Sequence, residues 1–128
     1  MKRVLLVVVL AFGLAVACTD DPATNVKLSA AGKQGEAVVK ANACAACHSI
    51  NGDALTGPTW KGLYGSKITL KGGGTVTADA AYIERSIREP NDQRRADANG
   101  VMPTFDESRI TDAQIAEIVA YIKDVSGS

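Results

Sequence analysis

Five consecutive residues carry the most distinctive chemistry of the chain: Cys44, Ala45, Ala46, Cys47 and His48 bring two thiols and an imidazole together. Two cysteines at this spacing on a helical turn can both reach the vinyl groups along one porphyrin edge. The adjacent imidazole then faces the iron. The segment therefore predicts one haem c, attached covalently through Cys44 and Cys47, with His48 as an axial ligand of the iron.

A cysteine pair can also belong to a structural zinc site, a redox-active dithiol or a simple disulfide. A structural zinc site needs four Cys or His ligands, and outside this segment the chain has no histidine and one further cysteine, Cys18. A thioredoxin-like dithiol would lie in a βαβ context, which the chain does not show, and a simple disulfide would leave His48 unexplained. The composition therefore favours haem over these alternatives.

The second axial ligand is predicted by elimination. His48 is the only histidine, and Met1 lies in a segment that we expect to be removed, so Met102 is the one remaining thioether. A lone methionine more often fills a gap in a core. However, histidine with methionine is the pairing found in electron-transfer haem proteins, so Met102 is the predicted partner of His48.

The amino terminus has the parts of a signal peptide. Lys2 and Arg3 precede an uncharged run of 14 residues, 4–17, which is shorter than the about 20 residues that a membrane-spanning helix needs. We therefore predict that residues 1–17 are a signal peptide and that the protein is exported to the periplasm.

Cys18 follows the predicted cleavage site. Residues 14–18 resemble a bacterial lipobox, although Ala15 stands where Leu, Val or Ile is usual, and residues 15–17 also fit ordinary cleavage. An unpaired third cysteine in an exported protein suggests a modified thiol. We expect lipidation of Cys18, with residues 18–31 as a polar tether to a domain spanning 32–128. The alternative is an unmodified cysteine on a soluble periplasmic protein.

Apolar periodicity predicts three helices and no sheet, and therefore an all-α domain. The helices are expected at residues 33–43, at 78–88 after Thr77 as N-cap, and from Thr111 to Ser126. On the second helix, Ile83 and Ile87 form an apolar stripe, and Arg88 is assigned to the solvated side with its charged neighbours. The long irregular segments 48–77 and 90–106 are expected to wrap a cofactor.

Net charge excludes one class of partner. Without residues 1–17 the chain carries 12 basic and 14 acidic residues, so its net charge is slightly negative. A protein that binds nucleic acid through its overall charge would be basic, so this class is excluded.

Several segments of the chain together resemble a class I c-type cytochrome. They are similar in particular to the cytochrome c domain of bacterial cytochrome c oxidase subunit II. The resemblance covers about residues 32–126 and rests on residues 44–49, residues 56–66, Arg88-Glu89-Pro90, Met102-Pro103 with Phe105, and a closing helix with Tyr121. It implies a small fold of three main helices and long loops wrapped around one haem.

The resemblance also implies roles for individual residues. The Pro58 carbonyl would accept a hydrogen bond from the axial imidazole, and Trp60 and Tyr64 would line the haem pocket or approach the propionates. Plain core packing is the alternative for both aromatic rings. Gly35 would mark the crossing of the first and last helices, next to Tyr121.

The sequence departs from this pattern in its charged segment 93–98 and lacks the copper-binding domain of an oxidase subunit II. Six-coordinate iron favours electron transfer over enzymatic chemistry, so we expect a one-electron carrier and not an enzyme. Its donor would be a quinol-oxidising complex or a dehydrogenase, and its acceptor a terminal oxidase. The alternatives are a fixed cytochrome subunit of a membrane complex, and a ligand-binding haem protein with a labile methionine.

Overall fold

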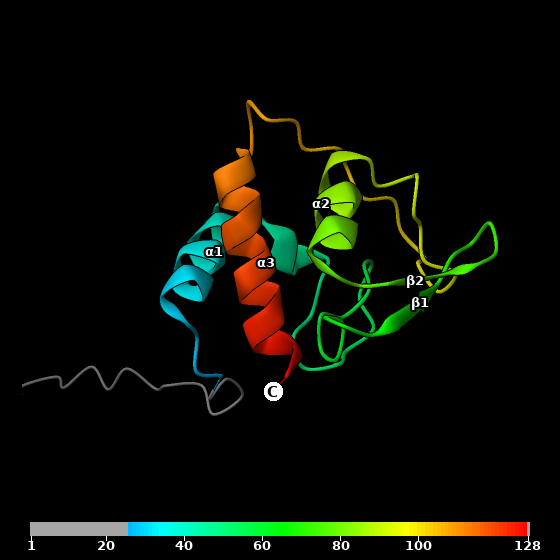
Figure 1. Ribbon diagram of the computed structural model, residues 1–128, viewed down its shortest axis with the longest axis horizontal. Coiled ribbons are helices and arrows are strands. Elements are labelled where there is room, and N and C mark those ends of the chain that lie inside the picture. Colours follow the sequence, from blue (N-terminus) through cyan, green and yellow to red (C-terminus); the bar gives the residue numbers. More distant parts are fainter. Residues whose placement is uncertain (1–25, 128) are drawn as a thin grey trace, which may run out of the picture.

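The computed structural model describes residues 26–127, so the predicted signal peptide, Cys18 and most of the predicted tether lie outside the described residues. Within them the predicted all-α fold is confirmed (Figure 1). The elements are α1 (Ala30–Ala41), a short 3-10 helix η1 (Cys44–Ala46), β1 (Lys67–Thr69), β2 (Thr75–Thr77), α2 (Ala80–Arg88) and α3 (Asp112–Ser126).

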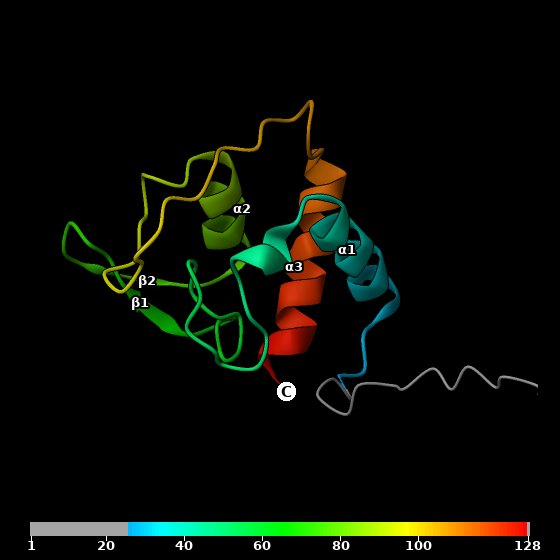
Figure 2. The same ribbon diagram turned by 180° about the vertical axis from the view of Figure 1, so that it is seen from behind.

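The first and last helices cross in close contact, as Figures 1 and 2 show from opposite sides. A Cβ at Gly35 of α1 would collide with the Glu117 carbonyl of α3 and would lie 2.9 Å from the Tyr121 Cβ. Glycine is therefore required at this crossing, as the resemblance implies. A capping box formed by Thr111 and Gln114 fixes the N-terminus of α3.

Two helix starts differ from the prediction. Helix α1 begins at Ala30 and not at residue 33, because the Ser29 hydroxyl caps the Gly32 N–H and also donates to Asp124 of α3. The helix therefore includes Ala30 and Ala31, which are predicted to belong to the tether. Helix α2 begins at Ala80 because Asp79 accepts the Tyr82 N–H as N-cap. Thr77, the predicted cap, belongs to β2.

A small antiparallel hairpin also departs from the prediction of no sheet. Strands β1 and β2 pair Lys67 with Thr77 and Thr69 with Thr75, and the turn between them uses Gly73 and Gly74 at φ 90° and 85°. Strands of three residues are too short to produce a detectable alternation in the sequence. The hairpin projects from the helical body on the side of α2 (Figure 1).

The core lies between the three helices and the loops that join them. Its buried apolar side chains are Val38, Val39, Trp60, Leu63, Ile68, Ala78, Tyr82, Ile83, Ile87, Phe105, Ile110, Ile115, Ile118, Tyr121, Ile122 and Val125. In residues 26–127, none of the helices has both the length and the apolar character needed to cross a membrane.

Candidate cofactor site

A pocket of about 990 Å³, including its opening to solvent, reaches into this core. The lining combines helical residues with both long irregular segments: Cys44, His48, Thr56, Pro58, Trp60, Leu63, Tyr82, Ile83, Ser86, Ile87, Pro90, Asn91, Gln93, Arg94, Arg95, Ala98, Gly100, Val101, Met102, Phe105, Ile110, Ile118 and Ile122. The two segments therefore surround a common space, as their length predicts.

The two predicted attachment cysteines lie on η1 and next to it. Cys44 is partly buried and lines the pocket, and burial raises the pKa of its thiol, whereas Cys47 is exposed. No disulfide joins Cys44 and Cys47. Ala43 connects α1 to η1 with a left-handed backbone, φ 53°, a conformation that is rare without glycine. This turn directs the chain from α1 toward the pocket.

His48 is held in one orientation. Its Nδ1 donates to the Pro58 carbonyl oxygen at 2.7 Å, as predicted for Pro58, so Nε2 keeps a lone pair for a metal. Burial lowers the pKa of the imidazole, which favours the neutral form that ligates iron. Gly57 allows this approach, because a Cβ there would lie 2.6 Å from His48 Cε1.

The two predicted aromatic residues differ in position. The Trp60 ring stacks on the His48 ring at 5.0 Å between centroids and meets Tyr121 edge-on at 5.9 Å. It also lines the pocket, as predicted. Tyr64 is not among the lining residues, and its ring lies 5.6 Å from the Lys123 ammonium. Tyr64 is therefore not placed on the pocket wall but packs against the core, and its approach to a haem propionate stays a prediction.

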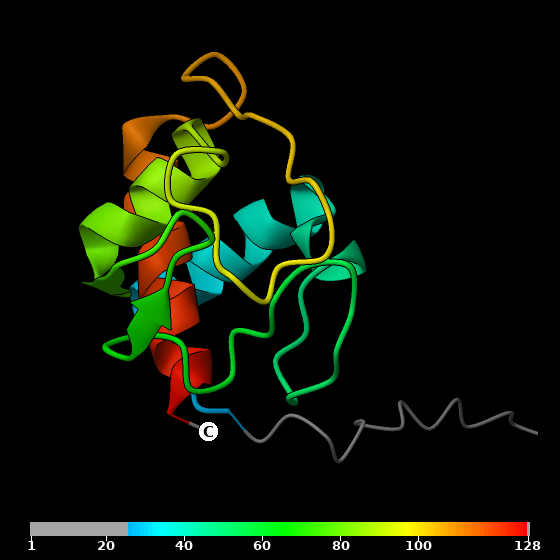
Figure 3. The ribbon, with the colours of Figure 1, turned by 90° about the vertical axis from the view of Figure 1, so that its right-hand side faces the viewer.

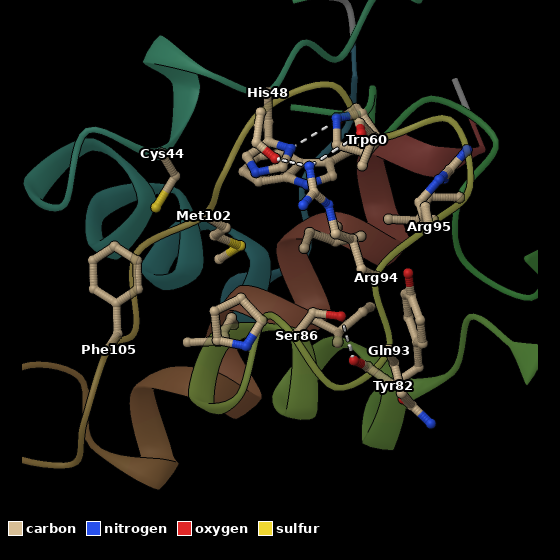
Figure 4. A pocket seen from close by; sticks show the side chains of 18 of the residues that line it. Cys44, His48, Trp60, Tyr82, Ser86, Gln93, Arg94, Arg95, Met102 and Phe105 are labelled. Carbon is tan, nitrogen blue, oxygen red and sulfur yellow. Dashed lines mark hydrogen bonds between the residues drawn. The ribbon is translucent and has the colours of Figure 1, made fainter. Parts of the chain in front are cut away.

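Met102 is partly buried and faces the same space as Cys44 and His48 (Figure 4). Its segment arches from the end of α2 to the start of α3 without regular secondary structure (Figure 3). Two backbone hydrogen bonds fix this arch: Gly100 N–H donates to the Thr56 carbonyl at 3.1 Å, and Phe105 N–H donates to the Ile87 carbonyl at 3.1 Å.

Arg88 holds the same arch from α2. Its Nη1 donates to the carbonyls of Phe105 and Ile110 at 2.9 and 2.7 Å, and its Nη2 lies 2.6 Å from the Asp112 carboxylate. The prediction that Arg88 belongs to the solvated side is wrong, since these acceptors cover it. Helical periodicity could not reveal this role, because the acceptors are backbone carbonyls from a later segment.

The donor groups and the pocket fit a haem. A thioether and a neutral imidazole face one space beside a thiol, and most of the surrounding wall is apolar. Within residues 26–127, no group of three His, Cys, Asp or Glu side chains is arranged to hold a metal ion by itself. The buried Nε of Arg94 has no hydrogen-bond partner among the described residues, so the wall retains an unused donor.

Comparison with known proteins agrees with this geometry. The family model for Cytochrome c matches residues 32–126, a range that includes both cysteines of η1 and its flank, His48 and Met102. No curated protein matches the chain significantly.

Proposed function

Because the chain belongs to the cytochrome c family, we propose that it transfers single electrons through one haem c attached at Cys44 and Cys47, with His48 and Met102 as axial ligands. The family implies haem-based electron transfer. The observation that supports this ligand pair is that the fixed imidazole and the Met102 thioether line one pocket. When bound, the haem supplies an iron that alternates between two oxidation states.

The residues of the chain keep rearrangement small during this change. Pro58 holds the Nδ1 proton and so orients the ring, while Trp60 covers the ring face at 5.0 Å. Apolar side chains such as Ile83, Ile87 and Ile118 exclude water from the pocket. If His48 and Met102 both ligate the iron, no ligand position would remain open for a substrate, which would favour a carrier over an enzyme.

The proposed partners and location rest on the sequence. The apparent signal peptide and Cys18 support an exported protein, anchored by lipid at Cys18 or soluble in the periplasm. A quinol-oxidising complex or a dehydrogenase would donate electrons, and a terminal oxidase would accept them. A fixed subunit of a membrane complex, suggested by the similarity to oxidase subunit II, is the alternative, and it would co-purify with its complex in mild detergent.

The ligand assignment is tested with Met102→Ala in the purified holoprotein. We expect haem to stay attached, the sulphur-to-iron charge-transfer band to disappear and the reduction potential to fall, because a thioether favours ferrous iron. Val101→Ala is the matched control, since this neighbouring side chain is 75% exposed. An unchanged band in Met102→Ala would refute Met102 as the ligand.

The anchor is tested separately with Cys18→Ser. Lipidation would place the wild-type protein in the membrane fraction, and the variant would move to the soluble fraction with its haem. Mass spectrometry of the wild-type amino terminus provides the direct measurement. A free, unacylated Cys18 would refute the anchor and leave a soluble carrier.

A further inference from the structure

Arg94 lies where the β1–β2 hairpin, the pocket and the segment that carries Met102 meet. Its carbonyl accepts the Lys71 N–H at 2.9 Å, and the Ala96 N–H donates to the Thr69 carbonyl at 2.9 Å. Leu70 and Arg95 form an isolated antiparallel bridge between these bonds. The backbone of Arg94 is therefore fixed against the β1–β2 hairpin.

The side chain of Arg94 reaches from there into the pocket (Figure 4). Its Nη2 donates to the carbonyls of Gly100 and Ala98 at 2.8 and 3.3 Å, just ahead of Met102. The guanidinium thus joins the hairpin to the segment that carries the methionine. Residues 93–98, which include Arg94, are the charged segment that departs from the family pattern. The proposed electron transfer assigns no role to Arg94.

The Nε of Arg94 is the unusual atom. It is buried and has no partner among residues 26–127, and no ion pair of Arg94 is present there. The nearby carboxylate of Asp97 already binds Arg95 through two hydrogen bonds of 2.8 and 2.7 Å. The Arg94 side chain as a whole is only partly buried, but a buried N–H without an acceptor is costly, and a carboxylate is the group that guanidinium N–H donors fit best.

We propose that Arg94 Nε donates to a carboxylate of the bound haem, and that Arg94 thereby positions Met102 by joining the cofactor edge to the methionine segment and the hairpin. This inference rests on the proposed function, because it requires haem in this pocket. A haem carries two propionate carboxylates at its edge, so the pocket would bring its own acceptor to Nε. Arg94 is a positioning residue here, since it acts on Met102 through the carbonyls of Ala98 and Gly100.

The test compares Arg94→Gln and Arg94→Lys with wild-type holoprotein. Loss of the cation beside the haem favours ferric iron, so the reduction potential should fall in Arg94→Gln and fall less in Arg94→Lys, which keeps the charge. Displacement of Met102 from ferric iron by added imidazole should be about tenfold faster in Arg94→Gln, because a charge-assisted hydrogen bond is lost. Arg85→Gln is the matched control, as Arg85 lies exposed on α2 beside Glu89 and Asp92.

A second measurement uses only wild-type protein, so it does not depend on the folding of a variant. In nitrogen-15 spectra of ferrous wild-type protein, the Arg94 Nε–H should exchange slowly with water, and the exchange should not depend on acetate or phosphate in the buffer. An exchange rate that varies with either anion would assign Nε to a free anion and overturn the proposal.

Two further outcomes would overturn it. Rapid Nε–H exchange together with an unchanged potential in Arg94→Gln would show that water satisfies Nε. Faster imidazole binding without any change of potential would show that Arg94 only holds the loop. The proposed function is checked first and independently, since wild-type protein without attached haem or without the sulphur-to-iron band would refute it before any Arg94 variant is compared.

Discussion

His48 and Met102 face one pocket, but the two are held by contacts of different range. On the histidine side, residues 47–60, the groups that fix the imidazole follow it closely in the chain. The Pro58 carbonyl accepts from Nδ1 at 2.7 Å, Trp60 stacks on the ring, and the Gly57 N–H donates to the Cys47 carbonyl at 2.8 Å. These contacts close one short loop around His48.

On the methionine side, residues 98–110, most anchors lie farther away in the chain. The Gly100 N–H donates to the Thr56 carbonyl, the Phe105 N–H donates to the Ile87 carbonyl, and Arg88 of α2 binds the carbonyls of Phe105 and Ile110. Arg94 adds a contact of shorter range, to the carbonyls of Ala98 and Gly100. The histidine is therefore positioned by one short loop, whereas the methionine segment is fixed mainly by contacts with α2 and with Thr56.

The largest effect is expected on the histidine side, from Gly57→Ala. The added Cβ would lie 2.6 Å from His48 Cε1 and 3.0 Å from the Cys47 carbonyl oxygen, so the loop must move and the bond to Pro58 must lengthen or break. We expect the free energy of unfolding to fall by about 3 kcal/mol, as for other steric changes in packed sites. Urea unfolding of the holoprotein measures it.

The control for Gly57→Ala is Gly72→Ala. Gly72 lies in the hairpin turn, with open space around the site of a Cβ and without a positive φ. The free energy of unfolding of Gly72→Ala should differ from that of wild type by less than about 0.5 kcal/mol, as for substitutions at other surface sites. Equal effects of the two substitutions would show that the close approach at His48 does not constrain the loop.

On the methionine side, Arg88→Ala should lower the free energy of unfolding by about 2 kcal/mol, because two buried carbonyls lose a charged donor. Met102 should also leave the iron at a lower urea concentration than that of global unfolding, since its segment is released first. Monitoring the sulphur-to-iron band and the helical circular dichroism in one titration separates these events. Arg85→Ala, on the exposed face of the same helix, is the control. Coincident transitions in Arg88→Ala would contradict a separately held methionine side.

The difference in range also explains what could be predicted from the sequence. The helices, the crossing at Gly35 and the pocket positions of Cys44, His48 and Met102 follow from local patterns or from the resemblance, and the structure agrees with them. The bond from His48 to Pro58 belongs to the same short loop. The helices and the His48 loop are encoded by neighbours in the chain, so a pattern over few residues identifies them. Met102 is predicted by elimination, and the crossing at Gly35 only through the resemblance, because its partner Glu117 is distant in the chain.

The Arg88 anchor could not be predicted in this way. Arg88 looks like a solvated residue in its helical period, and its acceptors, the carbonyls of Phe105 and Ile110, carry no side-chain signature. The contact of the Tyr64 ring with the Lys123 ammonium, which belongs to a distant helix, is likewise not encoded in the motif around Tyr64. Side-chain contacts between distant segments depend on tertiary geometry, which periodicity and spacing do not contain.

The smallest effect is expected from Asp106→Asn and should appear only as a change in pH dependence. The Asp106 carboxylate accepts from the Ser108 hydroxyl at 2.6 Å and from the N–H groups of Ser108 and Arg109 at 3.0 and 3.2 Å, which closes the turn before α3. The Ser108 hydroxyl, followed by the backbone donors, lowers the pKa of this carboxyl. The ionised form therefore stabilises the methionine side.

The sign of the effect follows from proton linkage. Because the folded pKa lies below the unfolded value of about 3.9, this contribution is complete above that pH and is lost as the pH falls through the folded pKa. The free energy of unfolding should thus decline less steeply with acid in Asp106→Asn than in wild type. Urea titrations between about pH 3 and pH 6, around the carboxyl pKa, measure the slopes. Glu107→Gln is the control, since this exposed neighbour takes no part in the hydrogen bonds of Asp106. Parallel pH profiles for wild type and Asp106→Asn would show that the other contacts of the methionine segment hold it without this carboxylate.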